Sequence, residues 1–266
     1  MAERKVLFYD DFTADAVDQT LWNVEESEDN GDIKRYTARP ENIRLEGGDL
    51  VLTARREQYG KSPYTSASVT TAGKFSFRYG RLEMRAKLPY GQGLWPAFWT
   101  MGDDYLARGD ELGWPYAGEI DVMEFIGVGG EQARNDTVGI HNYGCEVYRD
   151  GRMGNNRSTG NLHWGIDRDH HKSSGNESVL EKGIYNDGYH IFAVEWTAYK
   201  IEWFVDGKKF HELAITGKDM ELAFHQPHWI IVNLGLVSGW GPEVNDTTPL
   251  PQEYRIDYVK VLAPEV

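Results

Sequence analysis

The sequence predicts an all-β protein built as a sandwich of sheets. Short segments rich in β-branched and aromatic residues recur along the chain, and turn residues separate them. Only one segment, near residues 218–224, has a convincing helical pattern. A chain of 266 residues with 40% hydrophobic content can bury a substantial core, and all-β sandwiches of this size are commonly one domain. We therefore expect residues 1–266 to form a single domain.

The expected strands are separated by turns throughout the chain. In order, they are Leu50–Ala54, Phe75–Tyr79, Arg81–Lys87, Tyr189–Thr197, Lys200–Asp206, Trp229–Leu234 and Tyr254–Leu262. The pair Asp206-Gly207 is a strong signal for a hairpin turn. The segment 148–178 is polar and rich in Gly, Asn, Arg and His, and we expect it to form a surface loop at one end of the sandwich.

Charge and composition limit the classes of partner. The chain has 28 Lys and Arg against 42 Asp and Glu, and the resulting net charge of −14 opposes binding to nucleic acid or to an anionic membrane. No apolar run approaches the roughly 20 residues that span a bilayer, and the first residues lack a signal peptide's apolar segment. A single cysteine, Cys145, excludes an internal disulfide. Aromatic residues make up 13% of the chain, which favours a flat ligand such as a sugar.

The stretch G-E-I-D-V-M-E-F at 118–125 contains three carboxylates in an otherwise apolar run. Simple alternation in a strand would put Glu119 and Asp121 on one face and Glu124 on the other. A β-bulge at Val122-Met123 would return Glu124 to the face of the other two acids. Their carboxyls could then approach the roughly 5 Å separation of a retaining glycosidase. Because like charges that close cannot all ionise cheaply, one carboxyl would act as an acid and another as an anionic nucleophile.

Two other interpretations of this stretch remain open. A solvent-facing polar strand explains most isolated E-x-D patterns, but here the aromatic segments W-P-A-F-W and W-P-Y-A-G precede it. A carboxylate metal cluster is the second alternative, and the lack of a well-spaced histidine on the strand makes a transition-metal site less favourable.

Several motifs together resemble glycoside hydrolase family 16. They are G-R-L-E-M-R-A-K-L-P at 80–89, G-L-W-P-A-F-W at 93–99, G-E-I-D-V-M-E at 118–124, A-V-E-W at 193–196, I-E-W-F-V-D-G-K at 201–208 and P-Q-E-Y-R-I-D-Y-V-K-V at 251–261. The E-x-D-x-M-E form is similar to that of the laminarinase-like endo-β-1,3-glucanases. The resemblance implies a β-jelly-roll sandwich with a concave cleft, retention of configuration and no cofactor for catalysis. It implies that Glu119 is the nucleophile, Asp121 an assisting acid and Glu124 the general acid/base.

The resemblance also implies residues that bind substrate. Trp95, Trp99, Trp114 and Trp240 match cleft positions, although a tryptophan of this kind can instead pack in the core. Asn42 and Arg85 match polar positions that touch sugar hydroxyls, and the alternative for Arg85 is a surface ion pair with Glu83. Departures from the family pattern near residues 233–242 put the subsite around Trp240 in doubt.

Two further positions come from the same resemblance. The active-site histidine is expected at His141, with His163 as the alternative. A structural calcium ion is expected on the convex side, held by the backbone carbonyl of Gly48 and the carboxylate of Asp257, because calcium prefers hard oxygen ligands.

The expected substrate is laminarin-type β-1,3-glucan. The alternatives within the family are mixed-linkage β-glucan and the marine galactans agar, porphyran and carrageenan. A transglycosylase would share the covalent intermediate, whereas a glucan-binding module of the same fold would lack the two glutamates. We expect a monomer that is secreted, with the signal peptide absent from this chain, and that binds neither nucleic acid nor membranes.

Overall fold

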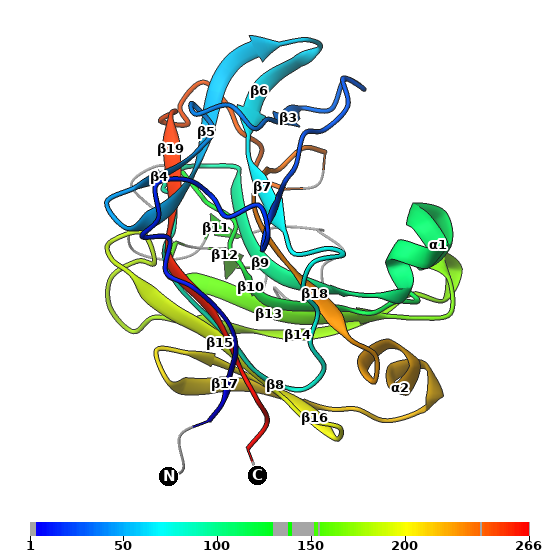
Figure 1. Cartoon of the computed structure of the whole chain (residues 1–266). Helices are drawn as coiled ribbons and strands as arrows, with labels where there is room; N and C mark the ends of the chain where they lie inside the picture. The colour runs from blue at the N-terminus through cyan, green and yellow to red at the C-terminus, as the bar shows by residue number, and fades with distance from the viewer. Residues whose placement is uncertain (1–3, 130–137, 140–151, 154, 240, 266) are drawn as a thin grey trace.

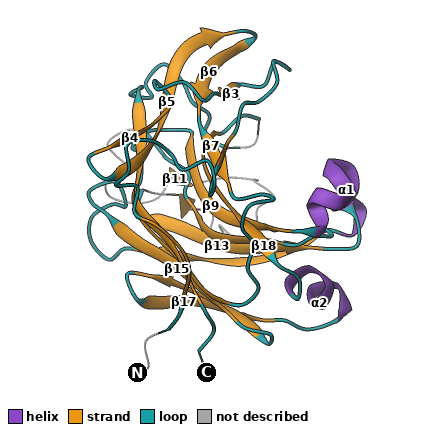
Figure 2. Ribbon diagram, viewed as in Figure 1, coloured by secondary structure: helices purple, strands orange, loops and turns teal. Residues whose placement is uncertain are grey.

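The computed structural model describes residues 4–129, 138–139, 152–153, 155–239 and 241–265. Within these ranges, most strands belong to two sheets that pack face to face (Figure 1). Two helices, α1 (Asp104–Gly113) and α2 (Lys218–Phe224), lie at the same side of the molecule (Figure 2). No helix in the described ranges is long and apolar enough to cross a membrane. The predicted sandwich of two antiparallel sheets is confirmed, with one parallel pair of strands as the exception.

The larger sheet, which we call the outer sheet, has ten strands in the described part of the chain. Its hydrogen-bonded order is β17 (Lys208–Ala214), β16 (Lys200–Val205), β15 (His190–Trp196), β8 (Gly80–Lys87), β19 (Gln252–Leu262), β5 (Asp49–Tyr59), β6 (Ser62–Ser66) and β3 (Lys34–Tyr36), while β1 (Val6–Asp10) pairs with β19 and β4 (Ile43–Glu46) pairs with β5. The parallel pair is β3 with β6.

The second sheet, which we call the inner sheet, has seven strands among the described residues. Its order is β14 (Lys172–Val179), β13 (Arg157–Trp164), β10 (Glu119–Glu124), β9 (Leu94–Gly102), β18 (His228–Leu236), β7 (Ser68–Thr70) and β2 (Asn23–Val24). A separate short pair joins β11 (Val138–Gly139) and β12 (Arg152–Met153). The glutamate-rich strand β10 therefore lies inside the inner sheet, between β9 and β13.

The hydrophobic core lies between the two sheets. In β8 the alternate residues Leu82, Met84 and Ala86 are buried against it, as period-2 alternation requires of a strand with one buried face. Phe98 of β9 enters the same cluster from the inner sheet. Burial of one such large apolar side chain contributes about 1.5–3 kcal/mol to folding. The shared core fixes the two sheets relative to each other.

Most predicted strands are present, and the predicted helix at 218–224 is α2. The hairpin at Asp206-Gly207 is also confirmed, because it joins β16 to β17 with φ angles of 50° and 77°. The segment Phe75–Tyr79 is not a strand. Only Phe77 forms an isolated bridge, with His228, and the φ angle of 66° at Tyr79 turns the chain away.

The prediction of a surface loop over 148–178 is wrong for the described residues of that segment. They contain β13 and most of β14, which pair as a hairpin in the inner sheet. Glycines in these strands permit close approach of neighbours, since a Cβ at Gly175 would lie 2.5 Å from the carbonyl oxygen of Gly160. Helix α1 was not predicted, and its pattern is interrupted by Gly109, whose φ of 71° breaks the helical geometry.

Candidate active site

The three acids of β10 share one face because the strand contains a β-bulge. Against β9, Asp121 pairs with Trp99 and Glu124 pairs with Ala97. Three positions separate the two acids, whereas only two separate their partners, so β10 has one extra residue. The register against β13 shifts over the same stretch. The predicted bulge is therefore confirmed, and it returns Glu124 to the face of Asp121.

The extra residue is accommodated in the core. Val122 and Met123 follow each other in sequence, yet both side chains are buried in the cluster between the sheets. The indole of Trp203, on β16 of the outer sheet, donates a hydrogen bond of 2.8 Å from Nε1 to the backbone carbonyl of Asp121. A Cβ on Gly160 of β13 would lie 2.3 Å from the Trp203 ring, so only glycine leaves room for it. Trp203 thus contacts the bulge from the core side of the inner sheet.

A different tryptophan indole binds each of the two glutamates. Nε1 of Trp114 donates to Oε2 of Glu119 at 2.6 Å, and Nε1 of Trp95 donates to Oε1 of Glu124 at 3.0 Å. Among the described residues, neither glutamate forms an ion pair with lysine or arginine. Each carboxyl therefore has a neutral donor that orients it without adding a positive charge.

The surroundings of the two glutamates raise the pKa of both carboxyls. Burial is the main cause for Glu119, and hydrogen bonds with Trp114 and Asp121 oppose it. Burial and the nearby charge of Glu119 raise the pKa of Glu124 to about 7, while the bond from Trp95 lowers it. A carboxyl with a pKa near 7 can donate a proton at neutral pH and accept one later. The extra hydrogen bond at Glu119 favours ionisation of that residue first.

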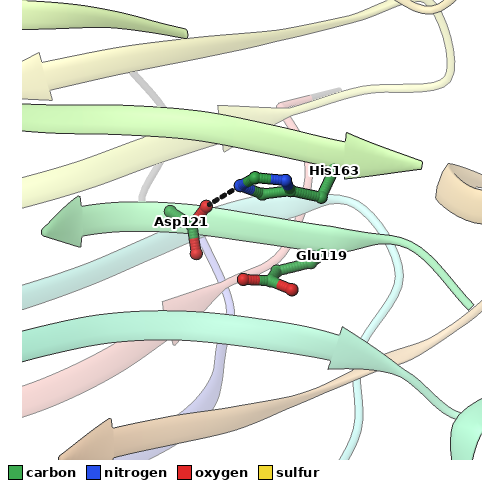
Figure 3. Close-up of side chains that lie close together, drawn as sticks. All are labelled: Glu119, Asp121 and His163. Carbon is green, nitrogen blue, oxygen red and sulfur yellow. Dashed lines mark ion pairs between the residues drawn. The ribbon is translucent and has the colours of Figure 1, made fainter. Parts of the chain in front are cut away.

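His163 completes this cluster from the neighbouring strand. It pairs with Glu119 across β10 and β13, and its Nε2 lies 3.5 Å from Oδ2 of Asp121 (Figure 3). Its Nδ1 lies 2.8 Å from Nε2 of His171. Burial and the neighbouring His171 lower the pKa of His163 to about 4, so the ring is neutral at neutral pH. His141, our first choice for this role, lies outside the described residues, and the structure puts the alternative, His163, beside the acids.

Glu119, Asp121 and His163 could also offer one atom each to a metal ion, because these atoms lie within 4.8 Å of one another. We assign them to acid–base chemistry instead. Trp114 already occupies one oxygen of Glu119 with a donor that cannot bind a metal, and the second glutamate on the same face has a pKa suited to proton transfer.

Two adjoining hollows lead away from Glu119. The one at Glu119 has a volume of about 360 Å³ and is lined by Trp99, Met101, Tyr105, Asp110, Trp114, Glu119 and Arg168. The other has a volume of about 410 Å³, shares four of those residues, and extends over β18 and β7 to Tyr36. Together they form a channel across the strands of the inner sheet, with α1 as one wall. We call this channel the cleft.

Trp95, Trp99 and Trp114 all lie on the side of the inner sheet that bears the acids. Trp95 and Trp99 are partly exposed on β9, whereas Phe98 between them is buried in the core, so the predicted shared face is confirmed. Trp99 lines both hollows and its Nε1 donates to Oδ1 of Asn233 at 2.7 Å. Trp240 lies outside the described residues.

The sequence matches the model of glycosyl hydrolases family 16 over residues 29–260. This chain belongs to that family. It is 33% identical over 240 residues to a beta-glucanase of Rhodothermus marinus, covering 87% of this chain and 74% of the relative. It is 31% identical to a glucan endo-1,3-beta-glucosidase of Cryptopygus antarcticus, covering 87% of this chain and 81% of the relative.

Solved structures of the family have the same fold. The laminarinase catalytic domain from Thermotoga maritima superposes with a TM-score of 0.77 and 30% identity, covering 99% of this chain and 100% of that one. Some relatives are much longer, since the chain spans only 29% of the clotting factor G alpha subunit of Tachypleus tridentatus and 38% of glucan endo-1,3-beta-glucosidase A1 of Niallia circulans.

Arg85 does not lie where the resemblance to family 16 implies. It lies on β8 of the outer sheet, where Leu82, Met84 and Ala86 face the core and the alternate residues face outward. Its Nη1 donates to Oδ2 of Asp257 at 2.6 Å and its guanidinium lies over the ring of Tyr189. The prediction that Arg85 touches sugar in the cleft is wrong, because its side chain faces away from the core on the outer sheet, whereas the acids lie on the inner sheet. An ion pair is present, but its partner is Asp257 and not Glu83.

The prediction of a sugar contact for Asn42 is also wrong. Its side chain is completely buried. Nδ2 donates at 2.9 Å to the carbonyl of Thr53 and to the hydroxyl of Thr65, while Oδ1 accepts from Thr37 and Arg39. With all its hydrogen-bonding capacity used inside the protein, Asn42 ties together the segments around β4, β5 and β6 and leaves no atom for a ligand.

The sequence did not predict that several residues would contact the acids or Trp114. In the sequence, Trp203 was only one letter of the motif at 201–208. Its alternation with Ile201 and Val205 indicates that it faces the core, but the sequence does not indicate that it binds the backbone of Asp121. Arg168 and His171 lie in the turn between β13 and β14, and no local pattern connects that turn to Trp114.

Proposed function

We propose that this protein is a retaining endo-β-1,3-glucanase that hydrolyses laminarin-type glucan by double displacement. The observation that carries the proposal is the bulge, which puts Glu119 and Glu124 on one face of the inner sheet. Family membership and the similarity to laminarinase structures support the same reaction and substrate. Curated relatives that are named endo-1,3-beta-glucosidases add further support.

In the first step, Glu119 attacks the anomeric carbon and Glu124 protonates the departing glycosidic oxygen. The bond from Trp114 holds one oxygen of Glu119, which orients the attacking oxygen. Glu124 enters this step protonated, because its pKa of about 7 keeps a substantial fraction of the carboxyl neutral at neutral pH. The products are a glycosyl ester on Glu119 and a free leaving-group sugar.

The second step uses the change in charge at Glu119. Formation of the ester removes the negative charge that helps to raise the pKa of Glu124. The pKa of Glu124 therefore falls after the first step, and its carboxylate is ready to take a proton from water. Attack by that water releases the product with its original β configuration. Asp121 is hydrogen-bonded to Glu119 and stabilises the Glu119 carboxylate when it is released from the glycosyl ester.

The charges of the cleft favour a neutral glucan over a sulfated galactan. Arg168 is the one arginine or lysine among the described lining residues of the two hollows, and it lies with the acids Glu25, Asp110 and Glu119. An anionic polysaccharide would meet a net negative cleft. Mixed-linkage β-glucan is the second candidate substrate, because relatives in Rhizobium meliloti are named endo-1,3-1,4-beta-glycanases.

The test is product analysis on a panel of purified polysaccharides: laminarin, mixed-linkage β-glucan, agarose, porphyran and carrageenan. We expect short oligosaccharides from laminarin early in the reaction, as an endo-acting enzyme produces. Cleavage of mixed-linkage glucan alone would replace the proposed substrate. Tight laminarin binding without any product would instead indicate a binding module, as in the relative of Penaeus monodon that is named a beta-1,3-glucan-binding protein.

We also propose a structural calcium ion near Gly48 and Asp257. Gly48 adopts a φ of 83° in the turn between β4 and β5, and Asp257 is partly exposed on β19. The ion would compete with Arg85 for the Asp257 carboxylate, so we expect modest stabilisation. A chelator should lower the melting temperature and added calcium should restore it. An unchanged melting temperature under both conditions would reject the site.

We further propose that the protein is a single-domain monomer that acts outside the cell. Its proposed substrate is a polymer too large to cross a membrane, which supports an extracellular location. Size-exclusion chromatography with light scattering should give a mass near the 30.3 kDa of the chain. A dimer mass across a tenfold dilution would contradict the monomer.

A further inference from the structure

The turn between β13 and β14 contacts the tryptophan that binds Glu119. Arg168 lies in this turn, in a short 3₁₀ helix that spans Arg168–His170. Its guanidinium lies over the ring of Trp114, with Cζ 5.3 Å from the ring centroid, and the ring of His171 lies 4.6 Å from the same ring. Trp114 in turn donates to Glu119 at 2.6 Å. A chain of contacts thus connects an exposed turn to the carboxyl of Glu119.

The guanidinium of Arg168 is held in place from a second side. Its Nη2 donates at 2.8 Å to the backbone carbonyl of Asp110 in α1. That carbonyl follows Gly109, where a φ of 71° interrupts the helix. A planar guanidinium with one fixed hydrogen bond loses little further freedom when it stacks on an aromatic ring. Arg168 therefore bridges α1, the turn and Trp114.

We propose that Arg168 is a positioning residue for the reaction: it clamps the Trp114 ring so that the indole N–H stays directed at Glu119. This inference rests on the proposed role of Glu119 as the nucleophile. A role in binding an anionic sugar is less consistent with the geometry, because Asp110 and Glu119 line the same hollow.

Several charged or titratable groups face Glu119 from the elements packed around it. They are Asp121 and Glu124 on β10, His163 on β13, His171 and Arg168 in the turn, and Tyr105 and Asp110 on α1. Of these, Arg168 carries the positive charge, and a change at Arg168 can reach Glu119 by two routes: directly through that charge, or through Trp114. The experiment must separate the two.

A double-mutant cycle with Trp114→Phe, which removes the indole donor, distinguishes the direct effect of the Arg168 charge from the effect through Trp114. The Trp114 Nε1–H bond lowers the pKa of Glu119, so weakening that bond raises it. In protein labelled with ¹⁵N-tryptophan, the Trp114 indole resonance, assigned by its absence in Trp114→Phe, should titrate with Glu119. Arg168→Ala should move that midpoint upward by about 0.3–0.5 pH unit. This readout needs no substrate, so it remains valid if the proposed function fails.

The kinetic arm uses the pH profile of laminarin hydrolysis. Arg168→Ala should lower kcat about threefold to tenfold with little change in KM, and the acidic limb should move to higher pH. When Arg168→Ala is added to Trp114→Phe, the acidic limb should stay where Trp114→Phe alone puts it. The indole N–H through which Arg168 acts is already missing in that variant. Lys172→Ala is the matched control: it removes a positive charge at the end of the same turn, but its Nζ pairs with Asp219 of α2. It should leave kcat and both limbs unchanged.

Three results would overturn the clamp. The first is a rise in KM alone, which would make Arg168 a substrate contact. The second is an equal shift of the acidic limb with and without the Trp114 indole, which would indicate a direct charge effect. The third is an unmoved indole midpoint in Arg168→Ala. If Arg168→Ala does not fold, Arg168→Gln is measured instead. It keeps a donor for the Asp110 carbonyl, and the same three criteria apply to it.

Discussion

Glu83 on the outer sheet and Glu124 on the inner sheet have pKa values that move in opposite directions. Glu83 is only 8% exposed, and its burial raises its pKa, but hydrogen bonds with Tyr258, Lys260 and Arg81 outweigh that effect and lower it overall. Glu124 has one indole donor and a neighbouring negative charge, and its pKa rises to about 7. The outer carboxyl stays ionised at neutral pH, whereas the inner one can exchange a proton.

Burial raises the pKa of both carboxyls, and they differ in whether their partners offset that rise. On the outer face, arginines and lysines accompany the glutamates, as in the contacts of Arg81 and Lys260 with Glu83 at 2.8 and 3.0 Å. On the inner face, Glu119 and Glu124 each accept a hydrogen bond from a tryptophan N–H, and Glu119 also shares a hydrogen bond with Asp121. An indole orients a carboxylate without pairing its charge, so the group remains reactive.

The largest effect is expected from removal of the two inner glutamates. Glu124→Ala should lower kcat by about 10²–10⁴-fold, the usual contribution of a general acid/base, and Glu119→Ala should lower it further because the covalent intermediate is lost.

With substrates that have good leaving groups, azide should rescue Glu124→Ala and give a β-azide product. For Glu119→Ala, azide should attack from the vacated side and give the α-azide. NMR of the products distinguishes them, and identical anomers from both variants would contradict the assignment.

Deletion of Met123 should remove the bulge and yet keep Glu124 on the face of Glu119. The deletion leaves E-I-D-V-E, in which simple alternation puts the second glutamate on the face of the first, still opposite Ala97. We expect activity to fall far less than in Glu124→Ala, whereas the loss of the buried Met123 side chain should lower stability by about 2–5 kcal/mol, measured by laminarin hydrolysis and thermal unfolding. The control Met123→Leu keeps the residue count and should cost less than about 1.5 kcal/mol of stability. A folded deletion variant that loses as much activity as Glu124→Ala would show that alternation alone does not bring Glu124 back to the face of Glu119.

Trp95 and Trp114 should have separable roles in stacking and in tuning. Replacement of either by Ala should weaken catalysis on long glucans by about 1–3 kcal/mol without unfolding the protein. Equal activity per folded molecule with a large drop in melting temperature would instead assign that tryptophan to the core.

The phenylalanine variant of Trp95 isolates the hydrogen bond. Trp95→Phe removes the donor that lowers the pKa of Glu124, so this pKa should rise above about 7. Since Glu124 must be protonated in the first step, the alkaline limb of kcat/KM should move to higher pH, by up to about one unit. Trp114→Phe should move the acidic limb instead. A shift of the alkaline limb to lower pH in Trp95→Phe would show that the indole does not stabilise the ionised form.

The smallest effect is expected on the outer sheet. Arg85→Ala removes a partly exposed ion pair with Asp257, and such pairs contribute about 0.2–1 kcal/mol. Laminarin hydrolysis should remain within the error of the unmodified enzyme, and unfolding should be slightly easier. A tenfold loss of activity would mean that Arg85 acts on the cleft from the opposite sheet.

The sequence was most informative where one local rule decided the structure. Alternation in β10 forced the choice between a buried Glu124 and a bulge, and Val122 and Met123 could both enter the core only with a bulge. The hairpin at Asp206-Gly207 could be predicted in the same way, because such a turn requires positive φ angles that Asp and Gly adopt more readily than most residues. In these places two or three adjacent residues determine the backbone.

Sequence reasoning failed where function depends on which sheet a residue joins. Arg85 alternates outward on β8, but the sequence does not say that β8 joins the outer sheet. Asn42 looks polar and available, yet contacts from distant Thr53 and Thr65 bury it. The contact of Arg168 with Trp114 joins residues 54 positions apart and depends on the full strand order of the inner sheet.

The configuration of the first product shows directly whether the enzyme works by double displacement. Proton NMR of laminarin hydrolysis by the unmodified enzyme, recorded before the new reducing ends mutarotate, reports the anomer that is released. A double displacement through Glu119 predicts that the β-anomer appears first and the α-anomer grows in later. Initial release of the α-anomer would mean direct attack by water, and would contradict the role of Glu119 as nucleophile.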